Sequence, residues 1–360
     1  MKKTLFLFTF LIGALSHQAH SNENIPLQHF FCDSAMTSGS LSPDGKYFAS
    51  MVPASGAKCA IEEIDDPQAA RVLLVIDLET NKPTVLSGTK GKSRLTGFTW
   101  ISNTRIAFFR QPEAGLDAYS MWAINVDGTK PKELVPGKWE DSYPTGARLL
   151  DRMKDDDNHI LVSYNKRRPK YTDVYKLNIF SGKLTMVAKD PVIDGQTSLG
   201  WAVDQQGLVR GYVAVKGLYT YLYHRNDADS DFELLRKFKF QEASFGPAAY
   251  SYDPRYVYMR GQAVGADGIV IDDSDTDALW LYDAYEDKFV EKVYENDRYD
   301  VGGIAISSKT EEPAYIAYYG DKPEKVWIDE DLEQVYATIE ASFPNDQVSI
   351  GGWTEDEDKA

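Results

Sequence analysis

Cysteine and positive charge are both scarce in this chain of 360 residues. It contains 2 cysteines, which is too few for a disulfide-rich scaffold or a four-cysteine zinc site. Its 39 lysines and arginines face 55 acidic residues, and the net charge of −16 argues against a nucleic-acid-binding or anionic-membrane-binding surface. The sequence also has no P-loop and no G-x-G-x-x-G motif, so nothing in it predicts a bound nucleotide or another cofactor.

Long hydrophobic runs are absent as well. The mostly apolar stretch at residues 5–15 is shorter than the roughly 20 residues that span a bilayer. Lys2 and Lys3 precede it, and Ala19 and Ser21 follow at the positions that a signal peptidase recognises. We therefore expect residues 1–21 to be a signal peptide, followed by an N-terminal segment at 22–40. The mature chain would be exported, periplasmic or extracellular, with no membrane span; a permanent anchor is the weaker alternative.

In an exported chain the two cysteines, Cys32 and Cys59, are a possible disulfide. A bond between them would close a loop of about 27 residues and stabilise the fold by roughly 3–4 kcal/mol on the chain-entropy model. The alternative is two unpaired thiols. His29 and Cys32 have the spacing of two metal ligands, but two further ligands are missing, so no metal is predicted.

A repeat of about fifty residues dominates the rest of the chain. Each unit opens with an apolar strand, a polar turn and a second alternating strand, which is typical of a β-hairpin. In the second half of a unit, an Asp or Asn follows an apolar residue by three places and precedes a turn, where its side chain can hydrogen-bond the backbone. The units begin near Leu41, Leu95, Gly146, Leu199, Phe245, Val301 and Val348. The second-half pairs are Leu74/Asp77, Trp122/Asn125, Tyr175/Asn178, Tyr223/Asn226 and Trp280/Asp283.

Four short antiparallel strands in about fifty residues is the period of a β-propeller blade. We therefore predict an all-β fold with six propeller blades at 41–347 and the truncated start of a seventh at 348–360. One helix interrupts the pattern near 329–343, where Leu332, Val335, Tyr336, Ile339 and Phe343 follow helical spacing. Acidic residues at 329–331 favour its N-terminus and Pro344 follows its end.

Three acidic clusters raise the question of a calcium site. Asp273, Asp275 and Asp277 resemble the start of a calcium loop, but Ala278 and Ala284 stand where glycine and a bidentate glutamate are needed. The cluster Asp227, Asp229 and Asp231 fails at Phe238, and Asp155, Asp156 and Asp157 lie between two strands. We expect solvated turns in all three places and no metal. The basic run at 166–170 is expected to be a solvated loop, with an acidic peptide end or a partner as the alternative ligand.

The repeat units resemble blades from the N-terminal propeller of prolyl oligopeptidase-type (S9) serine peptidases. The segments that carry the resemblance are LSPDGKYFASM, TDVYKLNIFSGKLTMVA, GWAVDQQGLVRGYV and DALWLYD. The helix and ASFPNDQVSIGGWTEDED also resemble the inter-blade segment that leads into the last blade of such proteins. The likeness covers residues 36–360 and is nearest to exported bacterial acylaminoacyl peptidases and dipeptidyl peptidases.

The sequence departs from that family in its chemistry. Such peptidases continue into an α/β-hydrolase domain whose catalytic serine lies in a G-x-S-x-G turn. The motif does not occur in these 360 residues, and the stretch at 195–200 has the wrong spacing. His29, His159 and His224 have no nameable nucleophile or orienting acid, so each is expected to be a surface or half-buried structural residue. We predict no catalytic residue in this chain and no peptide cleavage by it alone.

The resemblance implies a non-catalytic propeller that gates peptide access to a hydrolase domain outside these residues. The alternative is a stand-alone exported propeller that binds or scaffolds an envelope protein. A propeller enzyme with a central metal is disfavoured because no converging ligands can be identified. Propellers normally close by pairing strands across the ring, so a seventh blade that stops at 360 predicts an unpaired edge and reduced stability or self-association.

Overall fold

The computed structural model describes residues 36–53, 71–88, 93–111, 118–140, 143–191, 195–272 and 274–360. The predicted signal peptide, most of the segment at 22–40, His29, Cys32, Cys59 and Asp273 lie outside the described residues. Among the described residues, no helix is long and apolar enough to cross a membrane.

The described residues form a succession of antiparallel sheets in which each strand pairs with the next along the chain. The first sheet contains β1 (Thr37–Leu41), β2 (Tyr47–Pro53), β3 (Arg71–Asp77) and β4 (Lys82–Gly88). The second contains β5 (Arg94–Ser102), β6 (Arg105–Gln111), β7 (Ser120–Asn125) and β8 (Lys132–Val135). The third contains β11 (Ala147–Asp151), β12 (His159–Arg168), β13 (Tyr171–Asn178) and β14 (Leu184–Ala188).

The second half of the chain continues this pattern. The fourth sheet contains β15 (Thr197–Val203), β16 (Val209–Lys216), β17 (Tyr219–His224) and β18 (Glu233–Lys239). The fifth contains β19 (Phe245–Tyr250), β20 (Tyr256–Gly261), β21 (Ala278–Asp283) and β22 (Lys288–Tyr294). The sixth has three strands, β23 (Val301–Ile306), β24 (Pro313–Tyr319) and β25 (Pro323–Trp327). A separate hairpin of β9 (Lys138–Glu140) and β10 (Tyr143–Thr145) lies between the second and third sheets in the sequence.

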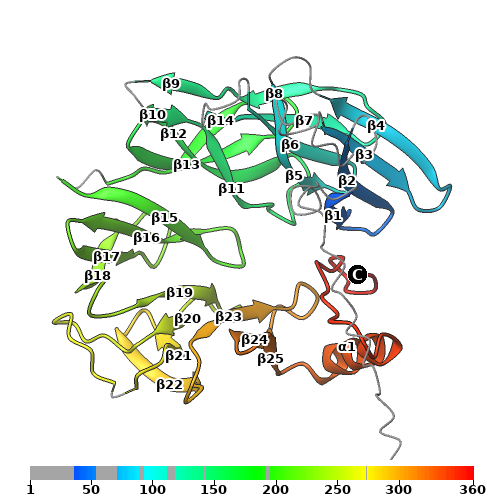
Figure 1. Cartoon of the computed structure of the whole chain (residues 1–360). Coiled ribbons are helices and arrows are strands. Elements are labelled where there is room, and N and C mark those ends of the chain that lie inside the picture. Colours follow the sequence, from blue (N-terminus) through cyan, green and yellow to red (C-terminus); the bar gives the residue numbers. More distant parts are fainter. Residues whose placement is uncertain are drawn as a thin grey trace, which may run out of the picture.

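The sheets follow one another around a common axis (Figure 1). The first strands of neighbouring sheets contact each other in the pairs β1 and β5, β11 and β15, and β19 and β23, which places them innermost. The prediction of an all-β propeller with four-stranded blades is confirmed. The sixth blade differs from it, because its fourth strand is replaced by the helix α1 (Glu330–Ser342).

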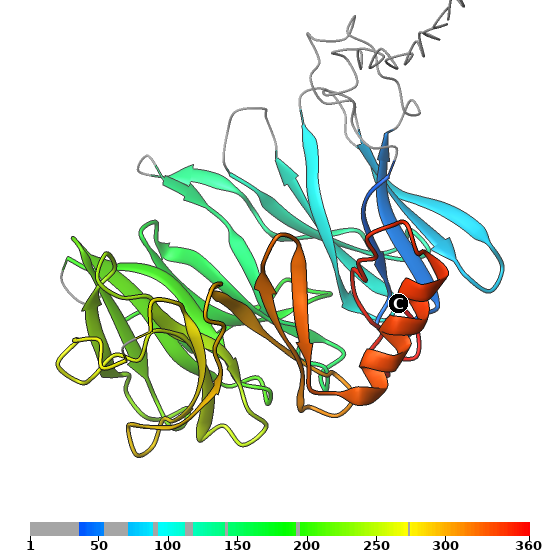
Figure 2. The ribbon, with the colours of Figure 1, turned by 60° about the horizontal axis from the view of Figure 1, so that its bottom comes forward.

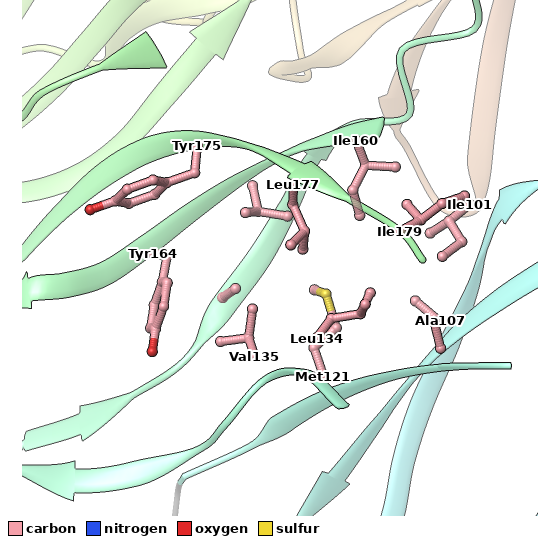
Figure 3. Packing of buried hydrophobic residues seen from close by; sticks show 13 residues of the cluster. Ile101, Ala107, Met121, Leu134, Val135, Ile160, Tyr164, Tyr175, Leu177 and Ile179 are labelled. Carbon is pink, nitrogen blue, oxygen red and sulfur yellow. The ribbon is translucent and has the colours of Figure 1, made fainter. Parts of the chain in front are cut away.

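Apolar side chains join neighbouring sheets. Between the second and third sheets, Ile101 and Met121 pack with Ile160 and Leu177 (Figure 3), and all four are at most 3% exposed. Four further clusters combine sheets one with two, three with four, four with five and five with six. No such cluster among the described residues joins the sixth sheet to the first. The period-two alternation thus buries one apolar layer at each of five junctions.

Three of the five expected Asp and Asn turns are capped as predicted, and two are shifted. Oδ1 of Asp77, Asn178 and Asp283 each accepts two backbone N–H groups of the turn that follows. In the second sheet Asp127 accepts the turn N–H of Thr129, because Asn125 Oδ1 accepts from Arg105 instead. In the fourth sheet this role belongs to Asp227 rather than Asn226, and β17 ends at His224, two residues before the position that the repeat predicts. The turn expected at 227–231 is thereby confirmed.

The helix α1 begins at the N-cap Asp329, whose carboxylate accepts the N–H groups of Asp331 and Leu332. Leu332 and Tyr336 are buried, as the helical spacing predicts. Val335 and Phe343 are exposed, because α1 packs through one narrow stripe only. The Tyr336 hydroxyl donates to Val348 O at 2.8 Å and fixes the chain that leaves the helix.

Residues 343–360 form no strand, yet they are anchored between the sixth and first sheets (Figure 2). The Glu355 N–H donates to Pro43 O in the β1–β2 turn, and the Glu357 carboxylate accepts Ser308 N and Ser307 Oγ in the β23–β24 turn. Thr354 N donates to Lys359 O, five residues on, as Ser42 N does to Tyr47 O in the first hairpin. The start of a seventh blade at 348–360 stays a prediction, and this turn agrees with it.

Candidate functional site at the axial face

The turn between β11 and β12 forms one wall of the candidate site. Asp151 Oδ1 accepts the N–H of Met153 at 2.6 Å, and Met153 has a positive φ of 56°. Asp156 donates its N–H to Met153 O, and its Oδ1 accepts the N–H of Asn158 at 3.1 Å. Aspartate is suited to this task because its short side chain hydrogen-bonds nearby backbone. The acidic run is therefore a hairpin turn, as predicted.

The turn between β15 and β16 forms the facing wall. Asp204 Oδ1 accepts the N–H groups of Gln206 and Leu208, and Gly207 supplies the positive φ of 80°. The side chains of this turn reach beyond their own sheet. Gln205 Nε2 donates to Tyr250 O at 2.9 Å, which belongs to the fifth sheet.

Side chains also cross the axis between the third, fourth and sixth sheets. Lys154 Nζ forms an ion pair with Glu311 of the β23–β24 turn, and this contact raises the pKa of Lys154. Gln205 Nε2 donates to Glu311 O at 3.2 Å. Arg152 pairs with Glu355 of the C-terminal turn at 3.2 Å. Together these contacts connect the turns of the third, fourth and sixth sheets and the C-terminal segment at this face of the ring.

A cavity of about 380 Å³ lies between these two turns. This volume falls in the range of ligand-binding pockets. Apart from Met153 and Gly207, its wall is polar, and it carries three cationic and three anionic side chains. The lining residues are Asp151, Arg152, Met153, Lys154, Asp155, Asp156, Lys176, Gln205, Gln206 and Gly207.

Asp156 is the wall residue whose negative charge is most strongly stabilised by its neighbours. Lys176 Nζ lies 2.6 Å from Asp156 Oδ2, and His159 Nδ1 lies 3.0 Å from Oδ1. The bonds to Lys176 and then to His159 hold the pKa of Asp156 well below its usual range. Asn178 Nδ2 contacts the other ring nitrogen of His159 at 3.3 Å. His159 is thus half-buried in a structural network, as predicted.

His224 lies elsewhere, at the end of β17, and it corrects the prediction of a surface or half-buried residue. It is 7% exposed and stacks on Tyr250. Burial, and secondarily the charge of Arg210, lower the pKa of His224 to about 4. Its Nε2 has no hydrogen-bond partner and the ring lines a cavity of about 20 Å³, which has room for one water molecule. No serine, threonine or cysteine in the described part of the chain hydrogen-bonds either of these two histidines.

The remaining acidic residues form no metal centre within the described ranges, where no cluster of three or more potential ligands occurs. The Asp277 N–H donates to Asp300 Oδ1 at 2.8 Å, and burial raises the pKa of the Asp277 carboxyl. The sequence did not single out Lys154, Gln205 or Glu311. Their only signal in the sequence is that each lies in the first turn of a repeat unit.

Comparison with known proteins finds two peptidases that the chain resembles, one in sequence and one in structure. The chain is 23% identical over 336 residues to dipeptidyl aminopeptidase BIII of Pseudoxanthomonas mexicana, an alignment that covers 88% of this chain and 41% of that protein. A prolyl endopeptidase structure superposes with a TM-score of 0.55 at 14% identity, covering 83% of this chain and 42% of the other. No protein-family model matches the chain.

The propeller domain of the trilobed protease from Pyrococcus furiosus also superposes, with a TM-score of 0.47 at 13% identity over 81% of this chain and 82% of that domain. The chain spans about two fifths of the length of the two peptidases above. It is an S9-peptidase-like β-propeller, and its 360 residues contain no G-x-S-x-G hydrolase motif.

Proposed function

We propose that this chain is the exported propeller of an S9-type serine peptidase and that it controls the access of peptides to a hydrolase domain. The alignment with dipeptidyl aminopeptidase BIII over 336 residues carries this proposal. In this role the chain contributes no nucleophile or proton-transfer group. It excludes folded substrates by its shape and presents polar groups to an unfolded one.

The axial face supports such a filter. The ion pair of Lys154 with Glu311 joins the third and sixth sheets, and the bond from Gln205 to Glu311 O joins the fourth and sixth. A folded protein therefore meets a closed surface there. An extended peptide needs only the displacement of partly exposed side chains, whose ion pairs are individually worth about 1 kcal/mol or less.

The reading frame downstream of codon 360 in the source genome tests the peptidase assignment. Continuation into G-x-S-x-G with later Asp and His codons is the expected result. A stop followed by unrelated sequence would remove the hydrolase partner and favour the stand-alone binding propeller.

Gating is tested in the gene product that carries the hydrolase domain. The substitution Glu311→Ala should raise kcat/KM for long peptides relative to a dipeptide substrate, because it removes the cross-axis ion pair. Lys309→Ala, an exposed residue of the same turn, is the matched control. An unchanged ratio in Glu311→Ala would contradict gating at this face.

Export is a separate part of the proposal, supported by the Lys2-Lys3 and residue 5–15 pattern. N-terminal sequencing of protein recovered from the periplasm should begin at or near Asn22. Recovery of unprocessed protein from the cytoplasm alone would refute it. The Cys32–Cys59 bond is checked in the same sample by thiol titration, with no free thiol expected.

A further inference from the structure

The hairpin β9–β10 projects from the ring next to the third sheet (Figure 1). A single buried side chain fastens it there. Asn165 Nδ2 donates to Pro144 O and to Pro169 O, both at 2.8 Å, and its Oδ1 accepts Gly146 N at 3.0 Å. These bonds join the hairpin to the β12–β13 turn and hold the two segments side by side.

The basic run at 166–170 begins in β12, which extends to Arg168, and ends in the β12–β13 turn, so the expectation of a solvated loop is wrong for residues 166–168. The structure divides the cations of the run into two sets. Arg167 turns inward and makes a two-pronged contact with Asp173, at 3.0 Å from Nε and 2.7 Å from Nη2. Lys166, Arg168 and Lys170 alternate with it and are exposed. No ion pair within the described residues engages Lys166 or Arg168. Three cations of the run thus remain available at the surface.

One aromatic ring lies beside these cations. Tyr143 is 39% exposed, and it pairs across the hairpin with Glu140; Trp139, 44% exposed, pairs with Pro144 and therefore faces the other side of the hairpin. Lys170 Nζ lies 5.1 Å from the centre of the Tyr143 ring. Exposed tyrosine is enriched in binding hot spots. We call the exposed set Lys138, Tyr143, Lys166, Arg168 and Lys170 the basic–aromatic platform.

The charge of this region is opposite to that of the protein. Segments 138–145 and 166–171, counted with Asp173, the partner of Arg167, contain five basic and three acidic residues, for a local net charge of +2 in a chain of −16. A local positive field on an acidic protein attracts a small acidic ligand. It attracts an extended anionic surface less well, because such a surface also meets the negative remainder of the chain.

We propose that the basic–aromatic platform binds an acidic peptide segment. Carboxylates of the peptide would pair with Lys166, Arg168 and Lys170, and its apolar or aromatic side chains would pack on Tyr143. The platform is a second recognition surface, distinct from the cavity of about 380 Å³ between the β11–β12 and β15–β16 turns. It does not depend on whether the chain serves a peptidase.

Fluorescence anisotropy with the whole chain tests this proposal. The probe is a fluorescein-labelled octapeptide of alternating glutamate and tyrosine, and the comparison probe replaces each glutamate by glutamine. The wild-type chain should bind the acidic probe, and the affinity should fall as salt screens the contact. The triple variant Lys166→Gln, Arg168→Gln, Lys170→Gln should weaken binding roughly tenfold or more. Tyr143→Ala should weaken it too, with less change in the salt dependence.

The matched control is Lys82→Gln, Lys183→Gln, Lys322→Gln, which removes the same charge from exposed lysines outside the platform, in the first, third and sixth blades. It should bind the probe as the wild type does. Equal affinity of the two triple variants, or of the acidic and glutamine probes, would overturn the proposal. Two other results would also overturn the peptide as occupant. One is stronger binding to phosphatidylglycerol vesicles than to the probe, and the other is salt-sensitive dimerisation that the platform variant abolishes.

Discussion

The buried arginine Arg105 offers a sharp test of how the blades are held together. It is 1% exposed and begins β6 in the second sheet. Its Nε donates to Ile179 O of the third sheet at 2.9 Å, its Nη1 to Asn125 Oδ1 at 2.6 Å and its Nη2 to Lys130 O at 3.0 Å. The guanidinium also lies 4.9 Å from the centre of the Phe180 ring. Arg105 thus connects the turns of two adjacent blades.

The substitution Arg105→Met keeps a long apolar stem and removes all three donors. Each hydrogen bond from a charged donor contributes about 1.5–3 kcal/mol net, and each acceptor left buried and unpaired costs about 1–3 kcal/mol. The contributions overlap, and removing a buried cation relieves its desolvation, which here lowers the pKa of the arginine. We expect a net loss of about 3 kcal/mol in the free energy of unfolding. The loss should be smaller for Arg105→Lys, which keeps the charge but lacks the planar set of guanidinium N–H donors.

Urea unfolding followed by tryptophan fluorescence measures this loss. With a slope of about 3 kcal/mol per molar urea, the midpoint should fall by about 1 M in Arg105→Met. Arg298→Met is the control, because Arg298 is exposed and contacts only the Tyr299 ring, 5.1 Å away. Its midpoint should move by no more than about 0.2 M. Equal midpoints for the two variants would refute the view that Arg105 joins the blades.

Three further predictions concern single residues. The pKa of about 4 for buried His224 lies below the ordinary value of 6.5, so between these two pH values the unfolded chain binds a proton that the folded chain does not. The free energy of unfolding should therefore fall by up to about 3 kcal/mol as pH drops from 6.5 to 4, and His224→Gln should flatten this part of the urea-midpoint profile. Asp329→Ala should cost about 1 kcal/mol by removing the N-cap of α1, whereas an unchanged melting temperature would show that the cap is unimportant. Gly261→Ala should lower the free energy of unfolding by more than about 3 kcal/mol, because φ of Gly261 is +126° and the new Cβ would lie 1.8 Å from Ser244 O. The control Gly97→Ala, whose Cβ meets no atom within 4 Å, should melt near the wild type.

The sequence predicted the repeat, the blade order and the helix, because these features have local signals. Alternation of apolar residues marks strands, and Asp77, Asn178 and Asp283 mark the turns that they cap. Asp329 marks the start of α1 for the same reason, since it bonds to the backbone only two and three residues away. Such interactions involve neighbours in the chain and leave a readable pattern.

Contacts between distant turns left no such pattern. The ion pair of Lys154 with Glu311 joins residues 157 positions apart, and each is an ordinary charged residue in a polar turn. Arg105 and Arg236 are also charged residues at strand positions that composition assigns to solvent, yet both are at most 3% exposed. Their burial depends on carbonyl groups of the next blade, which only the assembled ring brings into reach.

The junction between the sixth and first sheets is the physical link between the ring and its axial face. In a repeat structure, stability is close to a sum over neighbouring units, so the junction without an apolar cluster is the weakest in the described ring. Glu355 lies at this junction, where its N–H donates to Pro43 O, and its carboxylate pairs with Arg152 of the axial cavity wall. The segment that bridges this junction is thus also paired with the cavity wall. Movement at the weakest junction would displace this segment, and such coupling between junction and axial site is what the proposed gate for peptides would require.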